Sequence, residues 1–140
     1  MISRKIAIIG LGYVGLSLAA FLGNQVQVVG VDSNKEKIRT LEKGTSHFYE
    51  PKISYYLKRA IKKGLTFTDR ITKEVVSSDF IFITVGTPID KYGKMDLNNI
   101  KSVSTSIAKN MTNLQNNPSI IIKSTVIPGT TMHVVKPILE

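Results

Sequence analysis

The chain has no cysteine and no tryptophan, and its acidic residues are few. Without cysteine there is no disulfide framework, no thiolate metal site and no cysteine nucleophile, so a cytoplasmic protein is the default expectation. No apolar run approaches the roughly 20 residues that cross a bilayer. The short apolar run near the N-terminus leads into glycines and is typical of a strand rather than of a signal peptide. We therefore expect neither a membrane segment nor a metal site.

The shortage of acidic residues leaves 10 of them against 19 lysines and arginines, a formal net charge of +9. Such a charge raises the question of a nucleic-acid partner. The positive residues are dispersed, however, and no zinc-finger spacing or interleaved aromatic and basic pattern is present. The densest basic group alternates with apolar residues, as on the solvated face of an amphipathic helix: Lys52, Lys58, Arg59, Lys62 and Lys63. We expect no nucleic-acid site; a nucleic-acid-binding protein remains the minor alternative.

Apolar strand patterns and helix patterns alternate along all 140 residues. This alternation predicts one α/β domain over residues 1–140, with a doubly wound, mostly parallel sheet and helices on both faces. Strands are expected at 5–9, 26–32, 65–69, 79–85 and 119–126, the last two as buried strands. Helices are expected at 13–22, 34–41, 51–61, 71–78 and 98–110, with a final helix after 129 that bends or ends near Pro137.

The first strand runs directly into a G-x-G-x-x-G turn formed by Gly10, Gly12 and Gly15. The first glycine permits the tight turn, the second admits a pyrophosphate close to the backbone, and the third allows close packing of the next helix on the sheet. Asp32 lies 20 residues beyond Gly12, where a carboxylate accepts ribose hydroxyls and repels the 2′-phosphate of NADP. The combination predicts a Rossmann-type domain that binds NAD. The alternative is a structural strand–helix turn with Asp32 as a strand-end cap.

Four segments together resemble the N-terminal domain of the UDP-glucose/GDP-mannose dehydrogenase family: GLGYVGL (10–16), GTSHFYEP (44–51), TVGTPID (84–90) and KSTVIPGTT (123–131). The resemblance spans essentially the whole chain. It implies an NAD-dependent oxidoreductase of nucleotide-sugar metabolism that oxidises the C6 alcohol of a UDP- or GDP-sugar to a carboxylate with two NAD. Enzymes of this family, such as UDP-glucose 6-dehydrogenase, supply precursors for polysaccharide biosynthesis.

The resemblance also assigns the residues at the phosphate and adenosine end. Val14 matches the residue whose backbone N–H meets the pyrophosphate, and Tyr13 lies beside it in the same cofactor-binding segment. Asp32 and Lys37 match the contacts to the adenosine ribose. By spacing alone, Lys37 would be expected to point into solvent.

Two threonines are assigned in the same way at the nicotinamide end. Thr87 matches a contact beside the nicotinamide ribose, and Thr125 matches a cofactor contact at the floor of the active site, near the catalytic water. The alternatives are a turn former before Pro88 and a strand-end hydroxyl bonded to backbone.

The chain departs from the family pattern at several positions. His47 stands in place of a proline and is expected to be a surface residue, Lys52 and Ile53 replace a Gly-Leu pair, and Gly86 replaces a proline. The family's nucleophilic cysteine and its sugar-binding residues belong to central and C-terminal domains, which are absent from these residues. We therefore expect a truncated domain that binds NAD without turnover as a monomer, whereas the full-length enzyme is a homodimer that binds nucleotide sugar. A stand-alone NAD-binding or sensing module remains the alternative.

Overall fold

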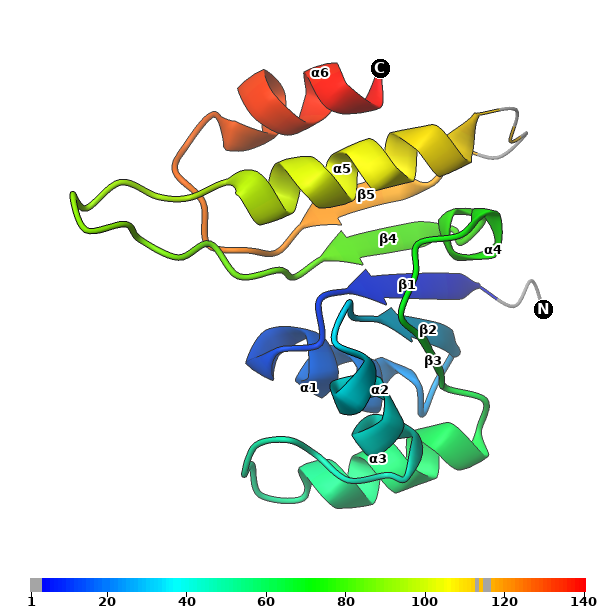
Figure 1. The fold of residues 1–140 in the computed structure, drawn as a ribbon. Helices are drawn as coiled ribbons and strands as arrows, with labels where there is room; N and C mark the ends of the chain where they lie inside the picture. The colour runs from blue at the N-terminus through cyan, green and yellow to red at the C-terminus, as the bar shows by residue number, and fades with distance from the viewer. Residues whose placement is uncertain (1–3, 113, 115–116) are drawn as a thin grey trace.

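The computed structural model describes residues 4–112, 114 and 117–140 and is built on a five-stranded sheet (Figure 1). The strand order is β3-β2-β1-β4-β5, and every pairing is parallel. The strands are β1 (Lys5–Ile9), β2 (Gln27–Val31), β3 (Thr66–Thr68), β4 (Phe80–Ile83) and β5 (Ser119–Ile122). Each lies within a segment that the sequence predicts as a strand, so the parallel α/β architecture is confirmed.

Helices cover both faces of the sheet (Figure 1). One face carries α1 (Tyr13–Leu22), α2 (Lys35–Glu42) and α3 (Ile53–Lys62), and the other carries α4 (Lys73–Val76), α5 (Asn98–Met111) and α6 (Lys136–Leu139). Side chains of β1 alternate between the two cores, because successive residues of a strand point to opposite faces. Ile8 packs with Leu16 of α1, while Ile9 packs with Ile107 of α5. The sheet is therefore doubly wound.

The starts of the helices follow from local chemistry in two cases. The Asn34 side chain accepts the Lys37 N–H at 3.0 Å and caps α2, and Thr72 accepts the Val75 N–H at 3.4 Å and caps α4. The third helix differs from the prediction that Pro51 lies in its first turn. Pro51 lies in the preceding turn instead, because Lys52 adopts a left-handed conformation with φ of 66° directly before the helix.

Two features near the C-terminus differ from expectation. The strand β5 is only partly buried, because it forms an edge of the sheet and pairs with β4 alone among the described strands. The last helical segment is not ended by Pro137. A π-helical turn over Thr131–Val135 leads directly into α6, and Pro137 lies in the first turn of α6, so the helical stretch continues past the proline.

The order of the strands creates a crevice at one edge of the sheet. From β1 the chain passes to β2 and β3 on one side, and it then returns to β4 on the other side. Ligands of open parallel sheets bind at such a reversal, at the carboxyl ends of the strands. Within the described residues, no helix has the length and apolar character to cross a bilayer.

Candidate functional site

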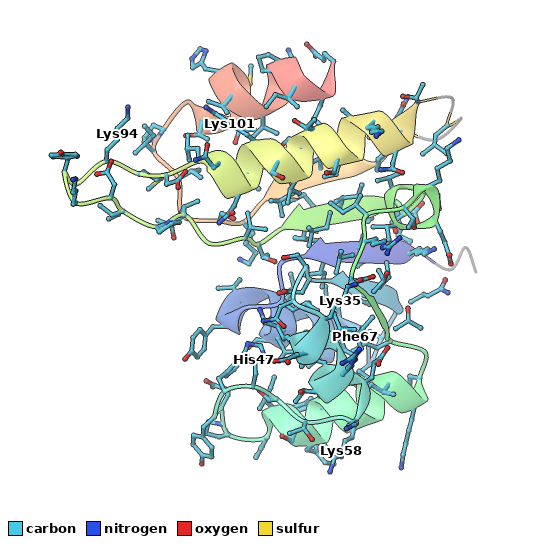
Figure 2. The ribbon with its side chains drawn as sticks, in the orientation of Figure 1. Lys35, His47, Lys58, Phe67, Lys94 and Lys101 are labelled. Carbon is cyan, nitrogen blue, oxygen red and sulfur yellow. The ribbon has the colours of Figure 1, made fainter. Side chains whose placement is uncertain are left out.

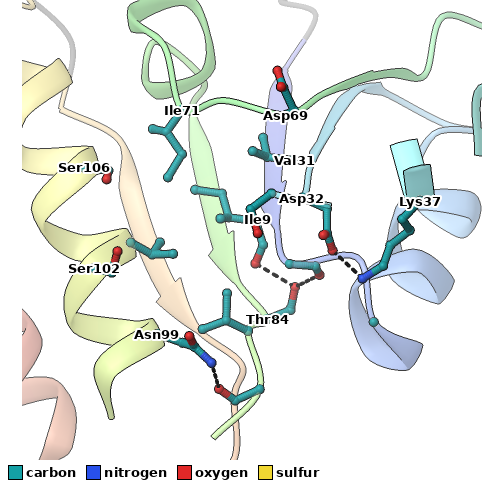
Figure 3. Close-up of a pocket in the computed structure, with 16 residues that line it drawn as sticks. Ile9, Val31, Asp32, Lys37, Asp69, Ile71, Thr84, Asn99, Ser102 and Ser106 are labelled. Carbon is teal, nitrogen blue, oxygen red and sulfur yellow. Dashed lines mark hydrogen bonds and ion pairs between the residues drawn. The ribbon is translucent and has the colours of Figure 1, made fainter. Parts of the chain in front are cut away.

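A cleft of about 470 Å³ opens at the carboxyl ends of β1, β2 and β4 (Figure 3). Its walls come from the segments that follow the strands and from one side of α5. Those residues are Ile9, Gly10, Gly12, Val31, Asp32, Ser33, Lys37, Asp69, Ile71, Thr84, Val85, Gly86, Asn99, Ser102, Val103 and Ser106. Four residues predicted from the sequence to bind a cofactor thus line one cavity: Gly10, Gly12, Asp32 and Lys37.

Two of the three motif glycines are required by the packing of the protein itself. Gly10 has φ of +98°, and a Cβ there would lie 2.9 Å from the backbone of Thr84 and Val85. Gly15 is buried in α1, where an added Cβ would collide with the Gly10 carbonyl and lie 2.6 Å from Thr84 Oγ1. Neither glycine needs a ligand to explain it.

Gly12 is different, because nothing in the protein fills the space beside it. Its φ of −75° suits any residue, and an added Cβ would meet no atom within 4 Å. It begins α1, whose first helical bond runs from the Leu16 N–H to the Gly12 carbonyl at 2.9 Å, and no side chain caps the helix. The N–H groups of the first helical turn have no intrahelical partners. A bare backbone and a helix N-terminus together fit a phosphate anion.

Asp32 is held as a carboxylate at the end of β2. Its side chain is 10% exposed and accepts hydrogen bonds from the Leu11 N–H at 2.9 Å, the Asn34 N–H at 3.0 Å and Lys37 Nζ at 2.7 Å. Burial raises the pKa of Asp32, but the Lys37 ammonium and the two backbone N–H groups outweigh burial and hold the pKa below its ordinary value. Asp32 therefore presents an ionised carboxylate beside the glycine turn, paired with the Lys37 ammonium.

Lys37 turns toward the cleft rather than into solvent. Its ammonium pairs with Asp32, and the side chain is 22% exposed (Figure 3). His47 lies close enough to feel both charges: burial and the Lys37 ammonium lower the pKa of His47, and the Asp32 carboxylate opposes them. His47, labelled in Figure 2, is exposed, as expected for a surface residue. Its ring packs edge-on against that of Phe48, with ring centroids 5.0 Å apart.

The other predicted site residues lie near the cleft but do not line it. Thr87 Oγ1 donates to the Thr125 carbonyl at 2.6 Å, which joins the loops after β4 and β5. The Thr125 side chain is exposed. Tyr13 and Val14 are 70% and 49% exposed at the start of α1. The structure thus brings the two threonines together, and it leaves the first turn of α1 accessible.

Several lining residues are absent from the sequence prediction. Asp69 and Thr84 each follow a strand, a position that could have drawn attention to them. Asn99, Ser102 and Ser106 form a polar row on α5 at helical spacing, and Asn99 Nδ2 donates to the Gly86 carbonyl at 2.9 Å (Figure 3). In the described part of the chain, no three His, Cys, Asp or Glu side chains are grouped to hold a metal ion.

Comparison with known proteins gives consistent relatives. Residues 4–140 match the model of the UDP-glucose/GDP-mannose dehydrogenase family, NAD binding domain. GDP-mannose 6-dehydrogenase from Pseudomonas aeruginosa is 37% identical over 138 residues, covering 97% of this chain and 32% of that protein. UDP-glucose 6-dehydrogenase TuaD from Bacillus subtilis is 36% identical over 141 residues, covering 98% of this chain and 29% of that protein. The crystal structure of a ternary complex of GDP-mannose dehydrogenase from Pseudomonas aeruginosa superposes with a TM-score of 0.92 at 36% identity, covering 96% of this chain and 31% of that one.

Proposed function

The chain belongs to the UDP-glucose/GDP-mannose dehydrogenase family, as its NAD-binding domain, and on that premise we propose that it serves an enzyme that oxidises the C6 alcohol of a nucleotide sugar to a carboxylate. The chain spans about a third of the length of the curated relatives that it matches. The nucleotide sugar then binds mainly to other domains of the whole enzyme, which carry the nucleophilic cysteine. Because these 140 residues contain no cysteine, we expect them to bind NAD without oxidising sugar.

The observation that carries the proposal is the open backbone at Gly12. A Cβ there would touch nothing in the protein, and the uncapped start of α1 faces the same space. We propose that the backbone N–H groups of Tyr13 and Val14 bind the pyrophosphate of NAD there. Gly10 and Gly15 shape the turn that presents these groups.

The adenosine end of the proposed site has a polar rim and apolar walls. Asp32 offers carboxylate oxygens to the ribose hydroxyls, and the Lys37 ammonium is 2.7 Å from one of those oxygens (Figure 3). Ile71 and Val103 provide apolar surface for a flat base between the sheet and α5. The Asp32 charge opposes the additional 2′-phosphate of NADP, so the site should favour NAD.

The nicotinamide end is assigned to the loops after β4 and β5. The hydrogen bond from Thr87 to the Thr125 carbonyl fixes these loops relative to each other, which supports a rigid floor at that position. Thr87 is proposed to contact the nicotinamide ribose, and Thr125 to orient the catalytic water. When NAD is bound, it accepts the hydride that leaves C6 of the sugar.

A fluorescence titration with NADH, and separately with NADPH, tests the proposal. The wild-type chain should bind NADH saturably and NADPH more weakly. Asp32→Asn should weaken NADH binding about tenfold, because hydrogen bonds to a charged acceptor are replaced by neutral ones. Asp79→Asn is the matched control, since its carboxylate accepts the Lys5 N–H at 2.7 Å at the opposite end of the sheet.

Two results would contradict the proposal. A folded wild-type chain that bound neither nucleotide would refute unaided NAD binding, and equal NADH binding by Asp32→Asn would refute the role of Asp32. We also propose that residues 1–140 form a single domain that is monomeric by itself, while the whole enzyme is a homodimer. Sedimentation that showed a tight dimer of this chain would contradict the first part.

A further inference from the structure

The peptide between Gly10 and Leu11 is held by groups from both neighbouring strands. The Leu11 N–H donates to Asp32 Oδ2 at 2.9 Å, at the end of β2. The Gly10 carbonyl accepts from Thr84 Oγ1 at 2.6 Å, at the end of β4. The peptide is therefore hydrogen-bonded to the Asp32 carboxylate on one side and to the Thr84 hydroxyl on the other.

The Thr84 hydroxyl donates its proton to the Gly10 carbonyl. Thr84 Oγ1 also lies 3.1 Å from the Ile9 carbonyl, but a hydroxyl has a single proton to donate. The Ile9 carbonyl already accepts the Thr84 backbone N–H at 2.8 Å, in the continuation of the sheet. The shorter contact, to Gly10, is therefore the hydrogen bond that the hydroxyl makes.

The surroundings hold the hydroxyl in place. Thr84 is 9% exposed, and its Oγ1 occupies the space that a side chain at Gly15 would need, 2.6 Å from an ideal Cβ. The glycine at position 15 thus makes room for both the Gly10 carbonyl and the Thr84 hydroxyl. Thr84, which follows β4, thus packs against the glycine turn and is hydrogen-bonded to it.

We infer that Thr84 is a positioning residue for NAD, whose hydroxyl fixes the Gly10–Leu11 peptide so that the Leu11 N–H faces Asp32 and the backbone at Gly12 stays open to the cleft. The inference rests on the proposed function. Glycine at position 10 leaves this peptide free to rotate. Rotation would break the hydrogen bond from the Leu11 N–H to Asp32 and would point the Gly10 carbonyl oxygen toward the Asp32 carboxylate and the proposed phosphate site. The Thr84 hydrogen bond holds the carbonyl on the opposite side and so adds to the preference for the observed orientation.

The test compares Thr84→Val, which replaces the hydroxyl by a methyl group that cannot donate, with Thr84→Ser, which keeps the hydroxyl. Ser78→Ala is the matched control, because Ser78 is a buried hydroxyl that donates to the Val75 carbonyl at 2.8 Å before the other end of β4. We expect the NADH dissociation constant to rise about tenfold in Thr84→Val and to stay within about twofold of wild type in the other two variants. Without nucleotide, amide hydrogen exchange at Leu11 should accelerate about tenfold in Thr84→Val alone.

The outcomes separate this inference from the proposed function. If the wild type binds NADH and Thr84→Val has the same NADH affinity and the same Leu11 exchange rate as the wild type, the role of Thr84 is refuted. NAD binding by the domain would still stand. Equal losses in Thr84→Ser and Thr84→Val would also overturn it, because shape rather than the hydroxyl would then be responsible. If Thr84→Val does not fold, Thr84→Cys supplies a weaker S–H donor and should show intermediate affinity and exchange; wild-type values in that variant would refute the tether.

Discussion

Substituting Gly12 by alanine should separate folding from cofactor binding. The added Cβ would find no protein atom within 4 Å, and the φ of −75° is unstrained for alanine. Alanine is a poorer N-cap than glycine, so the unfolding free energy should fall by about 1 kcal/mol at most. For a domain of this size, the melting temperature should then drop by roughly 3 °C.

The same methyl group should severely weaken NADH binding. It would stand between the pyrophosphate and the N–H groups of the first turn of α1, which makes up the floor of the proposed phosphate site. Hydrogen bonds to a charged group contribute about 1.5–3 kcal/mol each, so disturbing two of them should cost about 3 kcal/mol. This loss corresponds to roughly a hundredfold increase in the dissociation constant.

Gly15→Ala provides the contrast within the same motif. Its Cβ would collide with the Gly10 carbonyl and press on Thr84 Oγ1 inside a buried part of the fold. Overpacking of this kind should lower the unfolding free energy by about 3 kcal/mol. Urea unfolding of both variants and titration of Gly12→Ala with NADH provide the measurements. Normal NADH affinity in folded Gly12→Ala would refute the assignment of the open space to the pyrophosphate.

Two further predictions concern stability. Lys52→Gly should stabilise the domain by about 1 kcal/mol, because it removes a side chain from a left-handed backbone with φ of 66°. Arg59→Gly, at an exposed position inside α3, should destabilise the domain by about as much, and thermal unfolding distinguishes the two signs. The lowered pKa of Asp32 means that its contribution to stability is complete above its ordinary value of 3.8 and is lost as the pH falls below that value. Acid titrations of unfolding should therefore be steeper below pH 3.8 for wild type than for Asp32→Asn, and parallel curves would contradict the favourable pairing.

The local sequence predicts where the strands and helices of this fold lie, but it does not predict which elements lie next to one another in space. Continuous apolar runs and turn residues were sufficient to place β1 and β4, because these strands are covered on both faces. The partial exposure of β5 depends on its position at the edge of the sheet. The sequence of one strand does not determine the order of the strands, so this position could not be predicted from the β5 segment alone. Likewise, the lysine side chain at position 52 gives no sign that its backbone turns left-handed and delays the start of α3.

The candidate site shows the same division. Gly10, Gly12 and Asp32 were predictable because their spacing reflects one contiguous strand–turn–helix–strand unit. The Thr84 hydroxyl contacts Gly10 across 74 residues of sequence, and this contact depends on the register that pairs Ile9 with Ile83. The spacing alone predicts that the Lys37 side chain points into solvent. The ion pair of Lys37 with Asp32 could not be predicted in this way, because it depends on how α2 packs beside the end of β2.

The alternative that the glycine motif is only a structural turn explains part of the site and fails at one position. Asp32 does act as a cap, since it accepts the N–H groups of Leu11 and Asn34. Gly10 and Gly15 are demanded by the protein's own atoms, as a structural turn would require. Glycine at position 12 is a better N-cap than alanine, but a turn that served folding alone would gain more from serine, asparagine or aspartate, whose side chain would cap α1. The backbone at Gly12 is unstrained and the neighbouring space is open, so the lack of a capping side chain is best explained by a ligand that approaches the backbone, and Gly12 is the residue that best distinguishes a binding site from a turn.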